Sequence, residues 1–144
     1  MTVLVDTSVW SLLYRKDGPR RHPKVLILQQ LLEQNEDVSI TGSILQEILQ
    51  AFRPDHQFDR VANFFRPFGI VELERADYIA AAKLHRDCAS KGVAASTIDC
   101  QIAIASIKHD CLLLTADKDF HHIAEHCRLR LYEFQVPGSR FQVS

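Results

Sequence analysis

Two carboxylates stand after apolar runs, near opposite ends of the chain. Asp6 directly follows the run at 3–5, and Asp117 comes shortly after the run at 111–114. Short, continuously apolar runs are typical of strands that are covered on both faces. If the two strands are parallel neighbours, both acids lie at the edge of the sheet where ligands bind in such folds.

Two further acids lie in segments with the apolar spacing of helices. Glu47 borders the apolar stripe of the segment 43–52, a position that suits a side chain directed along the sheet edge. Asp99 stands near the start of the segment 97–109, three residues after Ser96. Side chains at strand ends and in the first turns of helices can converge. The sequence therefore predicts one pocket that holds all four acids.

Each acid taken singly also has a structural explanation. Asp6 and Asp117 could cap the helices that follow them. Asp99 could form a capping box with Ser96, and Glu47 could be a solvated helix residue. A cap contributes about 1 kcal/mol, whereas two carboxylates 4 Å apart repel by about 4 kcal/mol near a protein surface. Capping alone could not hold four acids in one pocket, but a divalent cation could.

The ligand set indicates which cation and which reaction to expect. Carboxylate oxygens suit Mg²⁺ or Mn²⁺ better than zinc, and no His or Cys residues are spaced to form a softer site. Such a cation polarises the oxygens of a phosphodiester and lowers the pKa of a bound water. With two metals about 4 Å apart, the attacking and the leaving oxygen are both stabilised. The acids therefore predict metal-dependent phosphodiester hydrolysis.

The elements that must position these acids follow from the apolar pattern. Five short apolar runs predict strands, at 3–5, 38–40, 70–73, 111–114 and 129–132. Between them, helical spacing predicts helices at 8–15, 23–34, 43–52, 56–65, 75–92 and 97–109. Strands that alternate with helices favour a mostly parallel sheet between helical layers. The expected fold class is α/β, with a five-stranded sheet in one three-layer domain over 1–144.

Composition excludes several classes of protein. The 144 residues contain 47% hydrophobic and 24% charged residues, as in ordinary globular proteins. The 17 basic and 18 acidic residues nearly cancel, so a nucleic-acid partner would require locally concentrated positive charge. The four cysteines form no C-x-x-C pair, which argues against a zinc ribbon. We expect no membrane segment, because no run approaches about 18 apolar residues, and we expect a reduced, cytoplasmic compartment.

A local concentration of positive charge does occur in the Gly/Pro-containing stretch 14–24. Its basic residues are Arg15, Lys16, Arg20, Arg21 and Lys24. The stretch could be a solvated loop, or an arm that contacts phosphates beside the acidic pocket.

The acids stand within motifs that together resemble a known family. The stretch VLVDTSVW, the helix that carries Glu47, and the stretches STIDCQIAIASI and LLLTADKDF have the order and spacing of a PIN-domain ribonuclease. The DTSVW opening and the compact length resemble the VapC toxins of toxin–antitoxin pairs. The resemblance runs from about Val3 to Phe134, and its motifs are individually short but jointly specific. It implies a PIN-like fold.

The resemblance also implies an activity and partners. VapC proteins are Mg²⁺- or Mn²⁺-dependent endoribonucleases that cut tRNA or rRNA. They are held inactive by a VapB antitoxin and usually form homodimers. By position, the family's four acids correspond to Asp6, Glu47, Asp99 and Asp117.

The resemblance assigns a role to each of these residues. Asp6 and Asp99 are expected to be the primary metal ligands, and Asp117 to complete the site directly or through water. Glu47 is expected to bind a second metal or to orient the attacking water. Three further residues match positions near the metal: Thr7, Thr115 and Asp119. The two threonines are expected to hydrogen-bond the carboxylates, and Asp119 could be a ligand or a helix N-terminal acid.

Other functions fit the sequence less well. A haloacid-dehalogenase-type phosphatase needs a second Asp two positions after Asp6, where this chain has Ser8. A response-regulator receiver needs a phosphoacceptor Asp after its third strand, where this chain has only Glu74. The alternative that stays open is a PIN-like module that binds RNA or a protein without cutting. The complete set of acids favours the enzyme.

Overall fold

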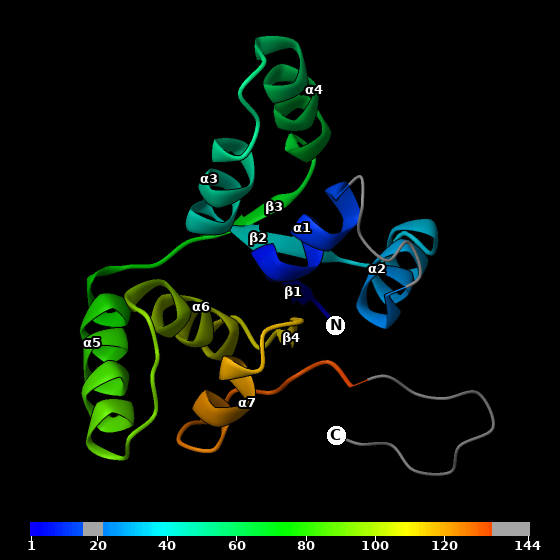
Figure 1. The fold of residues 1–144 in the computed structure, drawn as a ribbon. Coiled ribbons are helices and arrows are strands. Elements are labelled where there is room, and N and C mark those ends of the chain that lie inside the picture. Colours follow the sequence, from blue (N-terminus) through cyan, green and yellow to red (C-terminus); the bar gives the residue numbers. More distant parts are fainter. Residues whose placement is uncertain (16–21, 134–144) are drawn as a thin grey trace, which may run out of the picture.

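A four-stranded, fully parallel sheet forms the centre of the computed structural model, which describes residues 1–15 and 22–133 (Figure 1). Its strands are β1 (Val3–Val5), β2 (Val38–Thr41), β3 (Gly69–Val71) and β4 (Leu112–Leu114). They lie in the order β3-β2-β1-β4, and each neighbouring pair is parallel. The carboxyl ends of all four strands therefore lie at one edge of the sheet.

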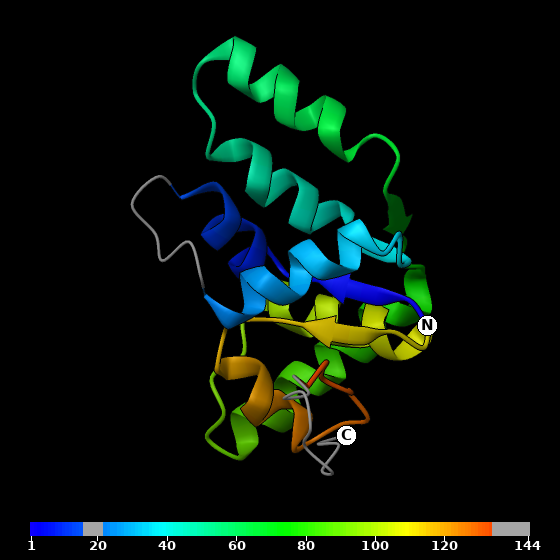
Figure 2. The same ribbon diagram turned by 90° about the vertical axis from the view of Figure 1, so that its right-hand side faces the viewer.

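Helices cover both faces of the sheet. They are α1 (Thr7–Tyr14), α2 (Pro23–Glu33), α3 (Gly42–Gln50), α4 (Asp55–Phe65), α5 (Arg75–Ser90), α6 (Thr97–Lys108) and α7 (Asp119–Ala124). Helices α1 and α2 lie on one side, and α6 lies on the other with α5 packed outside it (Figure 1). Helices α3 and α4 project as a pair beyond the β3 side of the sheet, as Figures 1 and 2 both show. The expected α/β fold with a parallel sheet between helical layers is confirmed.

The prediction of a fifth strand at 129–132 is wrong. Within the described residues, this segment makes one isolated parallel bridge, between Leu131 and Leu113. The Leu113 N–H donates to the carbonyl of Arg130, and the Tyr132 N–H donates to the carbonyl of Leu113. Leu129 is buried in the core. The apolar residues of this segment thus reflect packing beside β4 rather than a full ladder.

The continuously apolar strands are explained by burial on both faces. All three residues of β1 are buried, and so are Leu113 and Leu114 of β4. Trp10 of α1 is fully buried beside β1, and its indole N–H donates to the carbonyl of Val5 at 3.2 Å. This contact fixes α1 against the end of the strand that leads into Asp6.

The strand order creates a crevice at the carboxyl edge. From β1 the chain adds β2 and then β3 on one side, and afterwards crosses to place β4 on the other side of β1. The chain that leaves β1 and the chain that leaves β4 therefore turn away from each other at the carboxyl edge. In open parallel sheets such a point is where ligands bind. Asp6 and Asp117 both follow the strands that border it.

The described part of the chain has two further general features. None of its helices combines the length and the apolar character that crossing a bilayer requires. Its four cysteines carry free thiols, of which Cys88, Cys100 and Cys111 are buried.

Candidate metal centre

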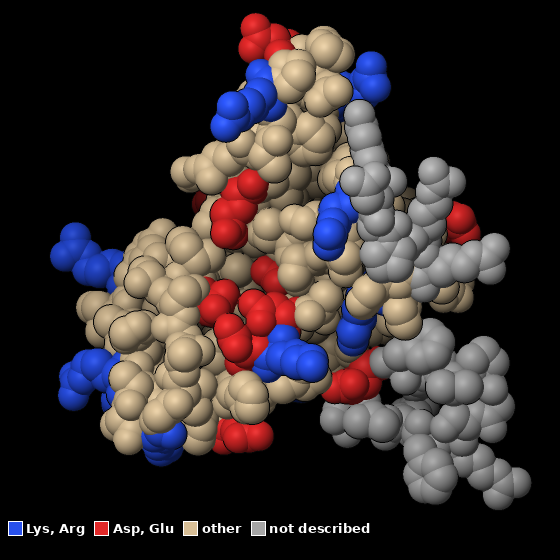
Figure 3. All heavy atoms as spheres, in the orientation of Figure 1, with Lys and Arg blue, Asp and Glu red and all other residues tan. Residues whose placement is uncertain are grey.

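Three aspartates converge at the crevice from three different elements. Asp99 lies in the first turn of α6, Asp117 in the loop after β4, and Asp119 at the start of α7. One carboxylate oxygen from each lies within 4.8 Å of the others. Figure 3 views the molecule from the side on which the strands end, and acidic side chains surround a hollow at the centre of that face. This spacing is compatible with one cation between the three carboxylates.

Asp6 lies beside this group and is only 5% exposed. Its Oδ2 atom accepts hydrogen bonds from the hydroxyls of Ser8 at 2.7 Å and Thr115 at 3.0 Å. Burial raises the pKa of Asp6, although these hydrogen bonds act in the opposite direction. The same Oδ2 atom accepts a hydrogen bond from the Ser8 N–H at 3.4 Å, and no unpaired side-chain oxygen among the described residues is shut off from solvent. One oxygen of the carboxylate is thus held in place by three hydrogen bonds.

Asp99 is half-buried and faces the other acids. Its side chain accepts a hydrogen bond from the Ser96 N–H at 3.4 Å, and its own N–H donates to the Ser96 hydroxyl at 3.0 Å. Burial raises the pKa of Asp99, and the negative charges of Asp117 and Asp6 raise it further. The capping box is therefore present, yet the carboxylate also stands among like charges. A cap does not require that arrangement, whereas a bound cation would relieve it.

Glu47 occupies a different side of the site. It is exposed on α3, and its Oε1 atom accepts a hydrogen bond from the Thr7 hydroxyl at 3.0 Å. Among the described residues, the group within 4.8 Å contains neither Glu47 nor Asp6. The structure thus brings Asp99 and Asp117 together with Asp119, with Asp6 beside them and Glu47 held by the start of α1.

A chain of hydroxyls connects Asp6 to the loop that carries Asp117. The Ser8 hydroxyl accepts a hydrogen bond from the Ala116 N–H at 2.9 Å, and the Thr115 hydroxyl accepts one from the Asp117 N–H at 3.0 Å. Asp117 in turn accepts one from the Asp119 N–H at 2.9 Å. Ser8 was not among the predicted site residues. Its place two residues after Asp6, where Ser and Asp side chains commonly bond nearby backbone, was the signal that could have revealed it.

The described residues include two members of the predicted basic stretch, Arg15 and Lys24. Lys16, Arg20 and Arg21 lie outside the described residues. Arg15 is exposed directly after α1, and Lys24 is partly exposed in the first turn of α2. A role for this stretch in binding RNA stays a prediction.

The donor set fits a hard divalent cation. The three converging side chains and Asp6 offer carboxylate oxygens, and the 4.8 Å group contains no His or Cys within the described residues. Oxygen ligands of this kind are typical of Mg²⁺ and Mn²⁺ sites. The burial of Asp6 and the like charges around Asp99 both penalise the metal-free state. The structure therefore contains a possible acidic metal site at the carboxyl edge of the sheet.

Comparison with known structures supports the same fold. VapBC2 from Rickettsia felis, solved bound to a DNA fragment from its promoter, matches with a TM-score of 0.72 and 17% identity, covering 94% of this chain and 100% of that one. FitAcB from Neisseria gonorrhoeae matches with a TM-score of 0.71 and 18% identity, covering 91% and 96%. VapBC-1 from nontypeable Haemophilus influenzae matches with a TM-score of 0.71 and 15% identity, covering 92% and 98%. At these identities the likeness concerns the fold.

A match of the sequence to a family model identifies the family. Among curated proteins, none matches it significantly. The family model of the PIN domain matches residues 3–126, which include every acid of the site. PIN domains are typically nucleases that use divalent metals. The resemblance stated from the motifs is thereby confirmed, and the chain belongs to the PIN domain family.

Proposed function

We propose that this protein is a metal-dependent endoribonuclease toxin that cuts tRNA or rRNA and is neutralised by a VapB-type antitoxin. The observation that carries the proposal is the convergence of Asp99, Asp117 and Asp119 within 4.8 Å, beside the buried Asp6. These acids come from four separate segments of the fold. Without a cation, their mutual repulsion opposes this convergence.

The proposed roles follow from the contacts of each side chain. Asp6, Asp99 and Asp117 would hold Mg²⁺ or Mn²⁺, with Asp119 as a further ligand. When bound, the metal would polarise the phosphodiester and lower the pKa of a water. Glu47, held by the Thr7 hydroxyl, would bind a second metal or orient the attacking water.

The hydroxyl groups have a separate task in this proposal. The Thr115 hydroxyl donates to Oδ2 of Asp6, which restrains rotation of the carboxylate. The other oxygen, Oδ1, would then stay directed toward the bound metal. Ser8 reinforces this restraint, because its hydroxyl also donates to Oδ2 and accepts from the Ala116 N–H.

The partners and the setting are proposed from the neighbours and the composition. Two of the solved neighbours are VapBC complexes, which supports an antitoxin of the VapB type. A homodimer, which the family resemblance implies, is part of the same proposal. The free thiols fit a cytoplasmic protein. The family match over residues 3–126 supports one PIN domain within 1–144.

Cleavage of total RNA by the purified, antitoxin-free protein tests this function. We expect discrete fragments with Mg²⁺ or Mn²⁺, and none with a chelator or with the Asp6→Asn variant. Asp59→Asn is the matched control, because Asp59 is an exposed acid on α4, away from the acidic site. Absence of cleavage by folded, metal-loaded protein over a broad RNA panel would favour a PIN-like module that binds without cutting. Cleavage that persists in both the chelator and the variant would contradict the proposed chemistry.

A further inference from the structure

A pocket of about 480 Å³ opens beside the acidic site, between the start of α3, the segment after β3, and helices α5 and α6. Its lining is continuous with residues of the site. Ser43 of the lining precedes Glu47 by one helical turn on the same face of α3, and Ile98 directly precedes Asp99. Its volume lies within the range of pockets that bind small organic groups.

The strand register also places this pocket next to Asp6. Leu4 of β1 pairs with Ser39 of β2 in parallel register. Two residues further on, Asp6 and the pocket residue Thr41 therefore lie at the same level on neighbouring strands. A group bound in the pocket would thus lie beside a phosphate bound at the acids.

The chemistry of the lining favours a neutral polar group over a phosphate. Its polar side chains include the amides of Gln46 and Gln101 and the hydroxyl of Ser43. Among the described residues that line it, only Glu72 is charged, and a carboxylate repels phosphate. A Gln amide carries both a donor and an acceptor, the combination with which proteins read the edge of a base.

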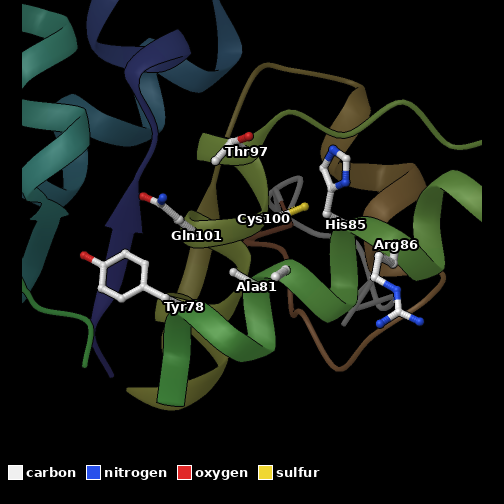
Figure 4. A pocket seen from close by; sticks show the side chains of 8 residues that line it. Tyr78, Ala81, His85, Arg86, Thr97, Cys100 and Gln101 are labelled. Atoms are coloured by element: carbon white, nitrogen blue, oxygen red, sulfur yellow. The ribbon is translucent and has the colours of Figure 1, made fainter. Parts of the chain in front are cut away.

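Tyr78 adds an aromatic surface to this pocket. Tyr78 is 51% exposed near the start of α5, and it lines the pocket together with apolar residues such as Ile98. Figure 4 shows the adjacent pocket between α5 and α6, and the polar ends of Tyr78 and Gln101 both point out of it to the same side. An exposed tyrosine ring is a platform on which an unpaired base can stack.

The two amides retain hydrogen-bonding capacity. Gln46 donates one hydrogen bond to the side chain of Gln50 at 2.9 Å, which leaves its carbonyl oxygen and its second amide hydrogen. Gln101 is partly buried, and its amide makes no hydrogen bond to any other described residue. A ligand with several donors and acceptors would satisfy both amides at once.

We propose that this pocket binds one unpaired RNA base next to the cleaved phosphate, with Gln46 and Gln101 reading its edge and Tyr78 stacking on its face. The inference rests on the proposed function, because it supplies that ribonuclease with base specificity. The shared elements α3 and α6 hold this base pocket and the acidic site in fixed relation. Gln46, Gln101 and Tyr78 are therefore specificity-determining residues.

Sequencing of the cleaved RNA ends tests this assignment. The wild-type protein should show a base preference at a position flanking the cut. Gln101→Ala and Tyr78→Ala should reduce that preference by a factor of about 5 to about 100, the usual range for one base contact. Tyr78→Phe should retain the stacking contribution. Gln29→Ala is the matched control, because Gln29 is an exposed glutamine on α2. An unchanged preference in Gln101→Ala and Tyr78→Ala would overturn the proposal.

A binding measurement separates this proposal from the nuclease activity. The probes are short oligouridylates in which the central position carries each of the four bases or an abasic residue, bound to the Asp6→Asn protein. We expect affinities that depend on the central base, and a loss of that dependence when Gln101→Ala is added. Base discrimination without cleavage by the wild type would refute the nuclease but support the pocket. Equal affinities for all five probes would refute the pocket, whether or not the wild type cuts.

Discussion

At the scale of single residues, the site is set by carboxylates whose charge is unfavourable in the metal-free protein. Asp6 is buried beside Val5 and Trp10, and burial raises its pKa above the ordinary value of 3.8. Asp99 shows the same direction, first from burial and then from Asp117 and Asp6. Acidic groups that are buried or that repel one another destabilise the folded protein. Such groups are frequently functional, because they do not contribute to stability.

The first prediction concerns the stability of the metal-free protein. Because the folded-state pKa of Asp6 is raised, the folded protein binds more protons than the unfolded chain between 3.8 and that pKa. Its stability therefore falls as the pH rises through this window. Asp6→Asn removes this penalty, and Asn is as good an N-cap as Asp. We expect its melting temperature at neutral pH to exceed that of the wild type by roughly 2–4 °C, with cleavage abolished.

Calorimetry in the presence of a chelator measures this difference. Asp59→Asn should leave the melting temperature unchanged, since that acid is exposed. A lower melting temperature for Asp6→Asn than for the wild type would show that the acid serves as a structural group, and would argue against the proposed metal site.

At the scale of elements, helix α6 connects the site to the rest of the fold. Its first turn carries Asp99, and its last residue, Lys108, donates a hydrogen bond to Asp77 of α5 at 2.6 Å. Lys108 also lies 3.6 Å from Glu74, the N-cap of α5. The two helices are thus tied together at the end of α6 opposite to the acids.

The second prediction separates the contribution of Lys108 to stability from metal binding at the acidic site. Lys108→Met should lower the melting temperature while leaving metal affinity unchanged, because Lys108 lies about two and a half helical turns from Asp99. The pKa of Asp77 is lowered by the Glu74 N–H and then by Lys108. The stabilisation is therefore present at neutral pH and is lost as the pH falls through the folded-state pKa of Asp77.

Thermal unfolding of the variant across the acid range measures this effect, with Lys83→Met as the control for loss of an exposed lysine of α5. A destabilisation of Lys108→Met that is equal at neutral pH and in strong acid would contradict a role for the ion pair. A large change in metal affinity would show that the tie positions Asp99.

Sequence patterns were sufficient for the elements but not for all of the site. Short apolar runs alternating with helical segments predicted a parallel sheet. That Asp6 and Asp117 share one edge followed only if their strands are neighbours, and the pairing of β1 with β4 supplies that condition. The proximity of Asp119 to Asp99 depends on the position of the start of α7 in the fold. The spacing of apolar residues does not predict that position. The segment 129–132 has strand-like composition, yet it makes a single bridge, and its apolar Leu129 packs in the core.

At the scale of the whole molecule, function depends on local rather than overall charge. The formal net charge is −1, so the protein carries no general attraction for RNA. A cation at the acidic site would reverse the local field where the phosphate must bind. The stability of the molecule should then depend jointly on metal and pH.

The third prediction follows from this coupling. A metal that binds only the folded state raises its stability by mass action, and carboxylate ligands must be deprotonated to bind it. Because the pKa values of Asp6 and Asp99 are raised, protons compete with the metal in mildly acidic solution. Mn²⁺ should therefore raise the melting temperature more at about pH 8 than at about pH 5.

Scanning calorimetry with and without Mn²⁺ at the two pH values provides this comparison. Asp99→Asn should abolish most of the shift, whereas Asp87→Asn, an exposed acid of α5, should retain it. Equal shifts at both pH values, or a full shift in Asp99→Asn, would place the bound metal elsewhere on the protein.

The measurement that tests the central claim most directly is anomalous X-ray scattering from crystals of the protein grown with Mn²⁺. We predict an anomalous peak at the carboxyl edge of the sheet, within coordination distance of Asp6, Asp99 and Asp117, and absent from Asp6→Asn crystals. Contact between this ion and Asp119 would establish that residue as a ligand. Ordered acids without a peak at saturating Mn²⁺, or a peak only at another site, would contradict the account.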